Sequence, residues 1–131
     1  MKIYDCFMYF DEDLVLEIRL NTLNKIVDKF VICEATRDHG GNKKSLKFQI
    51  EKFQNFKDKI EHIIVEDIPI NVRKRKRDWH ENHIRDQYQR NAIIRGLKNC
   101  DPKDWIMISD IDEIPDPKRI AEFDTRKKYA C

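Results

Sequence analysis

The sequence has few glycines and prolines and no long apolar stretch. Only 3 Gly and 4 Pro occur among 131 residues, a composition that excludes collagen-like and linker-like chains. No uninterrupted apolar stretch approaches the roughly 20 residues that cross a bilayer as a helix. The first residues also lack the apolar core of a secretory signal. We therefore expect no membrane span and a cytoplasmic location.

The sequence also lacks a large excess of charge of either sign. The 26 Lys and Arg nearly balance the 24 Asp and Glu, so net charge does not attract the chain to nucleic acid or anionic lipid. This balance, with 10% aromatic residues, argues against disorder. The four cysteines have neither CxxC nor zinc-finger spacing, which favours a reducing compartment. A Cys6–Cys33 bridge between neighbouring strands stays open for an exported protein.

Apolar patterning predicts strands that alternate with helices in one domain, residues 1–131. The apolar, β-prone runs that indicate strands cover 3–10, 29–35, 60–65 and 105–109. Apolar residues at helical spacing predict helices over 11–28 and 78–97, with shorter ones at 48–56 and 117–123. Strands joined through helices imply right-handed crossovers. The expected fold class is therefore α/β, with a mainly parallel sheet flanked by helices.

Acidic residues follow the predicted strands, at the edge where open α/β sheets bind ligands. The sharpest pattern is Asp110-Ile111-Asp112, directly after the last apolar run. Two neighbouring carboxylates repel each other unless a cation lies between them. Mg²⁺ or Mn²⁺, which prefer oxygen ligands, are the natural partners, and such an ion would neutralise a diphosphate. Asp110 and Asp112 are therefore candidate metal ligands, and a plain surface turn is the alternative.

Glu34 is a second candidate because it ends the second predicted strand. Acidic residues at this place in doubly wound folds often bind ribose hydroxyls, whereas the alternative is a solvated strand end. Neither the dinucleotide fingerprint nor the Walker loop occurs in the sequence. If a nucleotide binds, a metal and side chains must therefore hold its phosphates.

A basic run at 73–77 (RKRKR) is the competing lead, because it could bind nucleic acid with Trp79 stacking on a base. Its acidic flanks favour a solvated loop, so we expect no nucleic-acid partner. Attraction of an anionic sugar nucleotide or a membrane glycolipid is a different use of the run. On the long predicted helix, the pairs Glu81–Arg85 and Asp86–Arg90 have the spacing of helical ion pairs. An arginine that faces the last strand would instead bind phosphate.

Four collinear segments of the chain also match one enzyme family: IYDCFMYFDEDLVLEIRLNTLNKIVDKFVICEAT, FKDKIEHIIVEDIP, QRNAIIRGL and DWIMISDIDEIP. These segments resemble glycosyltransferase family 17, the family of bisecting β-1,4-mannosyl-glycoprotein β-1,4-N-acetylglucosaminyltransferases. The resemblance covers nearly the whole chain. Several motifs in the same order are far more specific than one D-x-D.

The resemblance implies a GT-A fold, which is Rossmann-like, and inverting transfer from a UDP-sugar to a glycan or glycolipid acceptor. By likeness, the donor is UDP-N-acetylglucosamine or a similar sugar nucleotide. Asp110 and Asp112 match the motif that holds Mn²⁺ or Mg²⁺ against the donor diphosphate, with Asp110 on the metal or the ribose. Glu12 and Glu34 become candidates for the donor pocket. Arg90, in the QRN segment, becomes a candidate for contact with the diphosphate.

The resemblance further implies that the C-terminal, acceptor-binding part of a GT-A enzyme is missing here. We therefore expect a short family member or its donor-binding half, with no general base assigned, and a homo-oligomer could complete the site. One alternative is a catalytically inactive GT-A-like module that binds a nucleotide or a partner. Another is a phosphohydrolase with an aspartate nucleophile. Phosphohydrolases usually carry D-x-D after the first strand, whereas here it follows the fourth.

Overall fold

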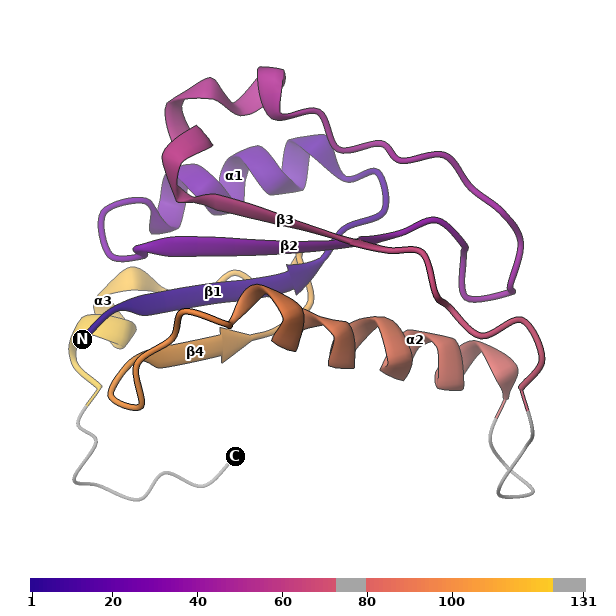
Figure 1. The fold of residues 1–131 in the computed structure, drawn as a ribbon. Helices are drawn as coiled ribbons and strands as arrows, with labels where there is room; N and C mark the ends of the chain where they lie inside the picture. The colour runs from indigo at the N-terminus through magenta and orange to yellow at the C-terminus, as the bar shows by residue number, and fades with distance from the viewer. Residues whose placement is uncertain (73–79, 124–131) are drawn as a thin grey trace.

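Four parallel strands form the centre of the structure, a computed structural model that describes residues 1–72 and 80–123 (Figure 1). The strands are β1 (Ile3–Met8), β2 (Lys29–Ala35), β3 (Ile60–Val65) and β4 (Trp105–Ile108). Their order in the sheet is β3-β2-β1-β4, and every neighbouring pair is parallel. The helices are α1 (Asp13–Leu23), η1 (Ile50–Lys59), α2 (Glu81–Asn91), η2 (Ala92–Gly96) and α3 (Pro117–Ala121). The predicted α/β class with a parallel sheet is therefore confirmed.

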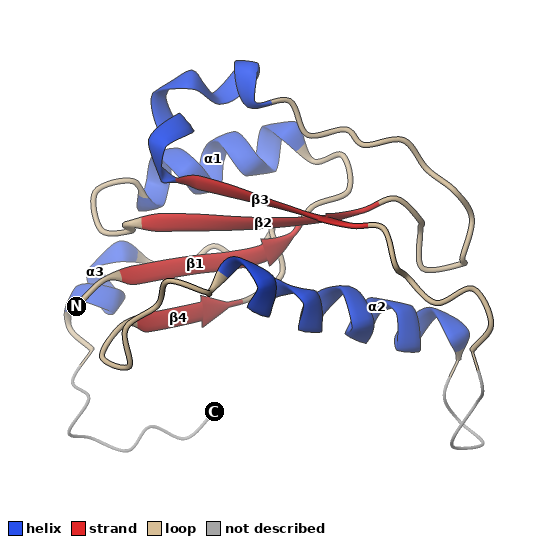
Figure 2. Ribbon diagram, in the orientation of Figure 1, coloured by secondary structure: helices blue, strands red, loops and turns tan. Residues whose placement is uncertain are grey.

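Helices cover both faces of the sheet (Figure 2). They bury two separate apolar clusters. On one face, α1 and η1 pack on β1 and β2 through Leu16, Leu20, Leu23, Phe53 and Phe56. On the other face, α2 packs through Tyr88, and η2 through Ala92 and Ile93, against a cluster that includes Val31, Cys33 and Val65. None of the helices in the described parts of the chain has the length and apolar character to span a bilayer.

Two helices differ from their predicted form. The long helix tightens into the 3₁₀ turn η2 where Gly96 packs directly on the sheet, since a Cβ at Gly96 would lie 2.6 Å from Val31 Cγ1. The short predicted helix at 48–56 is the 3₁₀ element η1, interrupted at Phe53 (φ −127°, ψ 39°). Close contact with neighbouring elements, which local spacing does not encode, sets both shapes.

Cys6, Cys33 and Cys100 are free thiols, although the first two lie on the neighbouring strands β1 and β2 as predicted. Burial raises the pKa of the Cys6 and Cys33 thiols to about 12. Both thiols are therefore protonated and unreactive at neutral pH. The basic run at 73–77, Trp79 and Cys131 lie outside the described residues.

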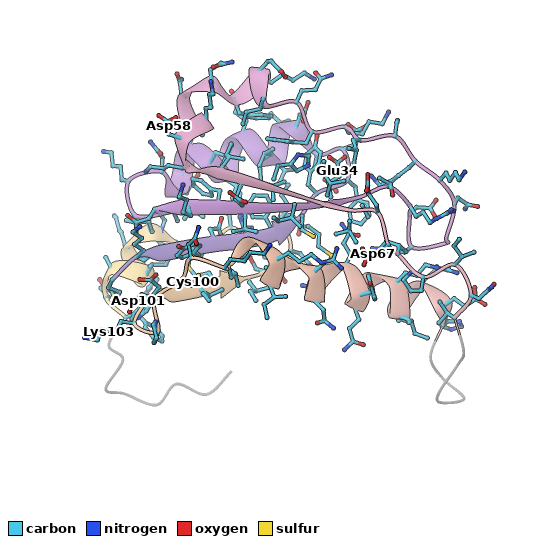
Figure 3. All side chains as sticks on the ribbon, viewed as in Figure 1. Glu34, Asp58, Asp67, Cys100, Asp101 and Lys103 are labelled. Atoms are coloured by element: carbon cyan, nitrogen blue, oxygen red, sulfur yellow. The ribbon has the colours of Figure 1, made fainter. Side chains whose placement is uncertain are left out.

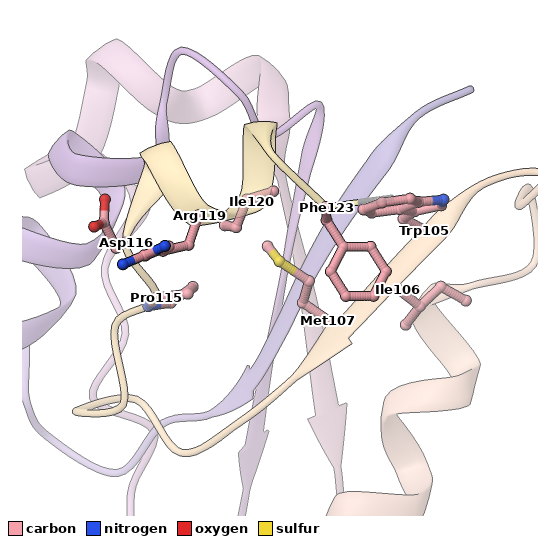
Figure 4. A pocket seen from close by; sticks show the side chains of 8 residues that line it. All are labelled: Trp105, Ile106, Met107, Pro115, Asp116, Arg119, Ile120 and Phe123. Atoms are coloured by element: carbon pink, nitrogen blue, oxygen red, sulfur yellow. The ribbon is translucent and has the colours of Figure 1, made fainter. Parts of the chain in front are cut away.

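An apolar pocket of about 520 Å³ lies between β4 and α3 (Figure 4). Trp105, Met107 and Phe123 line it, and the rings of Trp105 and Phe123 meet edge to face at 4.8 Å. Along β4, Trp105 and Met107 alternate with two exposed residues. These are Ile106 and Ile108, which are 44% and 52% exposed. Neither Asp110 nor Asp112 is among the residues that line the pocket.

Leu20 and Leu14 provide a matched test of the α1 packing. Leu20 is fully buried, whereas Leu14 on the same helix is 71% exposed. We expect Leu20→Ala to lower the free energy of unfolding by about 2–5 kcal/mol, because it leaves a cavity in the core. Leu14→Ala should change it by less than about 0.5 kcal/mol. Urea denaturation of the two variants measures both values, and equal losses would contradict the packing described.

Candidate functional site at the carboxyl edge of the sheet

The strand order reverses between β1 and β4. From β1 the chain passes through α1 to β2 and then through η1 to β3, always toward one edge of the sheet. It then returns through α2, on the opposite face, to β4 on the far side of β1. The carboxyl ends of β1 and β4 therefore flank the point of reversal, which is where α/β sheets bind ligands. Asp11 and Glu12 follow β1 at this point, and Asp110 and Asp112 follow β4.

The segment directly after β4 is a closed turn over residues 109–113. The amide of Glu113 donates to the Asp110 carbonyl at 3.0 Å, and the Glu113 carboxylate accepts from the Asp110 amide at 3.0 Å. Ile111 is 8% exposed and packs into the core cluster under α1. The aspartates on either side of it are exposed. This 109–113 turn therefore presents the Asp110 and Asp112 carboxylates outward from a buried anchor.

Arg19, on α1, holds the inner side of the same turn and was not identified from the sequence. Its guanidinium is fully buried and donates to the carbonyls of Asp110 at 2.7 Å, Ile111 at 3.0 Å and Glu113 at 3.2 Å. The sequence signal was present, because Arg19 lies three residues after Leu16 and directly before Leu20, on the apolar face of the helix. A charge at such a position indicates a buried partner.

That partner is Asp5, in the middle of β1. The Asp5 carboxylate is fully buried and accepts from Arg19 Nε at 2.8 Å and from Nη2 at 2.7 Å. The guanidinium also lies 4.7 Å from the centre of the Phe7 ring. Because both oxygens of the Asp5 carboxylate accept from the guanidinium, the two parallel hydrogen bonds fix the plane of the Arg19 guanidinium.

Arg90, at the end of α2, approaches the outer side of the 109–113 turn. Its Nη2 donates to Asp110 Oδ1 at 2.8 Å, while the predicted helical pair with Asp86 is longer, at 3.9 Å. The hydrogen bond to Asp110 raises the pKa of Arg90. The structure therefore brings two of the predicted site residues into direct contact. Asp112 is exposed and makes no hydrogen bond or ion pair with the residues described.

The oxygen ligands at the 109–113 turn suit a hard divalent ion. Within residues 1–72 and 80–123, no group of three or more His, Cys, Asp or Glu side chains could hold a metal. Mg²⁺ needs no such cage, because proteins often bind it through one or two carboxylates and let substrate phosphates complete its shell. Asp110 and Asp112 fit that pattern, and their carboxylates are the oxygens that would hold the ion.

Glu12 shapes the connection from β1 to α1. Its Oε2 accepts from the amides of Phe10 at 2.8 Å and Asp11 at 3.1 Å. This local hydrogen bonding turns the chain after β1 and starts α1 at Asp13. Glu12 thus lies at the point of strand reversal, opposite the 109–113 turn. Its contact with a donor stays a prediction.

Glu34 is a buried structural carboxylate, so the alternative of a solvated strand end is wrong. It is 0% exposed and accepts from the amides of Lys47 and Phe48 and from His62. Burial alone would raise the pKa of Glu34, but the three hydrogen bonds outweigh it and lower the pKa. The carboxylate therefore ties the 36–48 loop to β2. Its predicted contact with a donor stays a prediction.

Asp67, after β3, belongs to a separate cluster. Arg95 donates two hydrogen bonds of 2.8 Å to its carboxylate, and the Tyr88 hydroxyl donates a third at 2.7 Å. These donors lower the pKa of Asp67. Because β3 and β4 are opposite edges of the sheet, Asp67 is not brought to the 109–113 turn. Figure 3 shows Asp67 and Glu34 toward the end of the sheet to which the strands point, and Asp101 and Lys103 at the other end.

Lys44 is a further cation near the carboxyl ends of β1 and β2 that sequence reasoning missed. Its Nζ is buried and has no hydrogen-bond partner among the described residues. It lies 3.7 Å from Glu34 Oε2 and 5.8 Å from the centre of the Phe10 ring. Lys44 therefore adds positive charge beside Glu34, in a loop where nothing in the sequence pattern marked it.

The lowered pKa of Glu34 predicts an acid-dependent contribution to stability. Because its pKa is lower in the folded state than the ordinary 4.5, the contribution is complete above that value and is lost as pH falls through the folded-state pKa. We expect Glu34→Gln to cost about 1–3 kcal/mol at pH 7. The difference from the wild type should narrow below pH 4.5.

Urea denaturation from pH 7 to pH 3 measures this difference. The exposed Glu51, on η1, gives the control variant Glu51→Gln. The control should leave the pH dependence unchanged. A difference between wild type and Glu34→Gln that is constant across the range would contradict the expectation.

Comparison with known proteins gives one family. The family model of glycosyltransferase family 17 matches residues 1–127. The human β-1,4-mannosyl-glycoprotein 4-β-N-acetylglucosaminyltransferase is 28% identical over 109 residues, which cover 77% of this chain. The rat and mouse proteins of the same name have the same identity and coverage. The chain spans 19% of the length of these relatives. No solved structure matches the chain significantly.

Proposed function

The chain belongs to glycosyltransferase family 17, and from this premise we propose that it binds a UDP-sugar with a divalent cation and takes part in sugar transfer. The donor proposed is UDP-N-acetylglucosamine or a similar sugar nucleotide, and the acceptor is a glycan. The proposal includes inversion at the anomeric carbon and a GT-A type of site. In the reaction the acceptor oxygen bonds to the anomeric carbon, the bond from that carbon to the phosphate oxygen breaks, and UDP and the hydroxyl proton are released.

The observation that carries the proposal is the position of the 109–113 turn. Its two exposed aspartates follow the strand at which the sheet order reverses, and Arg90 of α2 contacts one of them, Asp110, at 2.8 Å. A diphosphate needs positive charge and a cation, and both can be supplied here without a glycine-rich loop. The basic guanidinium and the acidic pair lie next to each other, which suits a metal–diphosphate complex better than either ion alone.

Each residue of the site has a proposed task. Asp110 and Asp112 hold Mg²⁺ or Mn²⁺, which when bound supplies charge neutralisation for the departing diphosphate. Arg90 donates hydrogen bonds to the phosphate oxygens, and these strengthen as negative charge develops on UDP. Glu12 follows the carboxyl end of the neighbouring strand β1, where the nucleoside is expected. No described residue is assigned as the general base.

Asp112→Asn tests the metal-dependent step of the proposal. We expect UDP to raise the melting temperature of the wild type only when Mn²⁺ or Mg²⁺ is present. The Asp112→Asn variant should lose this shift, because a neutral amide is a weaker ligand for a hard cation. Glu17→Gln, which removes an exposed carboxylate from α1, is the control and should keep the shift. Thermal denaturation followed by circular dichroism gives the readout.

Two results would count against this function. A UDP shift that is independent of metal would remove the role of the two aspartates. Binding without release of UDP from UDP-N-acetylglucosamine, in the presence of glycan acceptors, would instead indicate an inactive binding module. A UDP-release assay on the full chain distinguishes the module from the transferase.

Arg90 and Arg95 provide a matched test of contact with the diphosphate. We expect Arg90→Gln to weaken the binding of UDP with Mn²⁺ by about 10-fold, which corresponds to about 1.4 kcal/mol. Arg95→Gln removes the same charge from η2, next to Asp67, and should change the affinity by less than about 2-fold. Isothermal titration calorimetry measures both values. Equal losses of affinity in the two variants would show that net positive charge, and not contact of Arg90 with the diphosphate, determines binding.

A further inference from the structure

We propose that Arg19 is a positioning residue for the candidate metal and donor site. Its buried guanidinium fixes the backbone of the 109–113 turn, so that Asp110 and Asp112 face the ligand in one arrangement. The inference deepens the proposed function and rests on it. It assigns a role in ligand binding to a buried residue of α1, which acts through the 109–113 turn.

The hydrogen bonds of Arg19 account for all five of its N–H groups. Nε and one hydrogen of Nη2 point to the two oxygens of Asp5, at 2.8 and 2.7 Å. The second hydrogen of Nη2 points to Ser109 Oγ at 2.7 Å. Nη1 serves the three carbonyls of the turn between 2.7 and 3.2 Å. Four of the six acceptors therefore lie within residues 109–113.

The geometry of the turn needs a cation on its inner side. Three carbonyl oxygens of residues 110–113 converge on one nitrogen, and their dipoles repel one another unless positive charge lies between them. With the carbonyls directed inward, the side chains of Asp110 and Asp112 are free to face solvent. Without Arg19, the carbonyls lose their donors and the turn must rearrange to reach water.

Stability alone gives a poor account of this ion pair. Both charges are fully buried, and desolvation of two buried ions often exceeds their mutual attraction. An apolar pair of similar size would replace the two charges themselves at little cost in stability, but it would leave the three carbonyls of the turn without the donors that Arg19 supplies. The specific gain from the guanidinium is the fixed position of the carbonyls, and through them of the two carboxylates. Small displacements of ligating groups cost large factors in binding and rate.

Asp5 completes the connection between the elements that meet at the point of strand reversal. It lies on β1, in register with Met107 of β4, and it orients Arg19 from α1 toward the turn that follows β4. Strand β1, helix α1 and the 109–113 turn are therefore linked through one guanidinium. Displacement of any of the three would move the Asp110 carbonyl.

The test combines Arg19→Met with Asp5→Leu, so that neither buried charge is left unpaired. Leu23→Ala is the control, because Leu23 is fully buried on the same helix, one turn after Arg19, and has no hydrogen bond to the 109–113 turn. Arg19→Lys is a second variant that keeps the charge but loses the fork geometry. The affinity for UDP in the presence of Mn²⁺ is measured by calorimetry at a temperature where circular dichroism shows every variant folded.

We expect the double variant to bind UDP with Mn²⁺ at least about 10-fold more weakly than the wild type. Leu23→Ala should bind within about 2-fold of the wild type even where it is the less stable protein. Arg19→Lys should fall between wild type and double variant. If the folded double variant, or folded Arg19→Lys where the double variant does not fold, binds like the wild type, Arg19 is structural only and the inference is wrong.

Amide hydrogen exchange without ligand separates this inference from the proposed function. The Glu113 amide, which donates to the Asp110 carbonyl, should exchange at least about 10-fold faster in the Arg19 variants than in Leu23→Ala, after correction for global stability. Unchanged protection would overturn the inference, whatever the ligand data. If the turn loosens as expected but wild type binds no UDP with Mn²⁺, the proposed function fails while the positioning of the turn stands.

Discussion

The buried ion pair between Arg19 and Asp5 is the interaction on which the site depends. It joins the first strand, the first helix and the turn after the last strand, and the hydrogen bonds of Arg19 span up to 94 residues of the sequence. Because the pair is removed from water, its hydrogen bonds are strong and direct, and a missing partner would be costly. The buried hydrogen bonds of Arg19 therefore support the turn that carries the exposed carboxylates.

The order of the strands explains why acidic residues from distant segments gather at one place. All four strands are parallel, so their carboxyl ends share one edge, and the reversal between β1 and β4 leaves the connecting helices on opposite faces there. Ile111 anchors the turn from below, and Arg90 holds it from α2. Glu34 and Asp67, by contrast, are saturated by donors from their own chain. They stabilise loops.

Much of this arrangement follows from sequence patterns, and the exceptions have physical causes. The runs at 29–35 and 60–65 match β2 and β3 residue for residue, because both are short runs rich in β-prone residues. Arg19 was missed because helical spacing marks the buried face but not the ion it faces. Glu34 was expected at a strand end, and its burial depends on Lys47, Phe48 and His62, which only the folded loop brings near. Sequence patterns locate the strands and helices, whereas the partners of a buried charged side chain are known only from the tertiary structure.

The contact between Arg90 and Asp110 has a thermodynamic consequence for ligand binding. One carboxylate oxygen of Asp110 already faces a fixed positive charge at 2.8 Å, so a lone cation meets repulsion as well as attraction there. An anionic diphosphate would draw the guanidinium to itself and release that oxygen. Two ligands that each remove the obstacle to the other are coupled by linkage, and each then tightens the other's binding by the same factor.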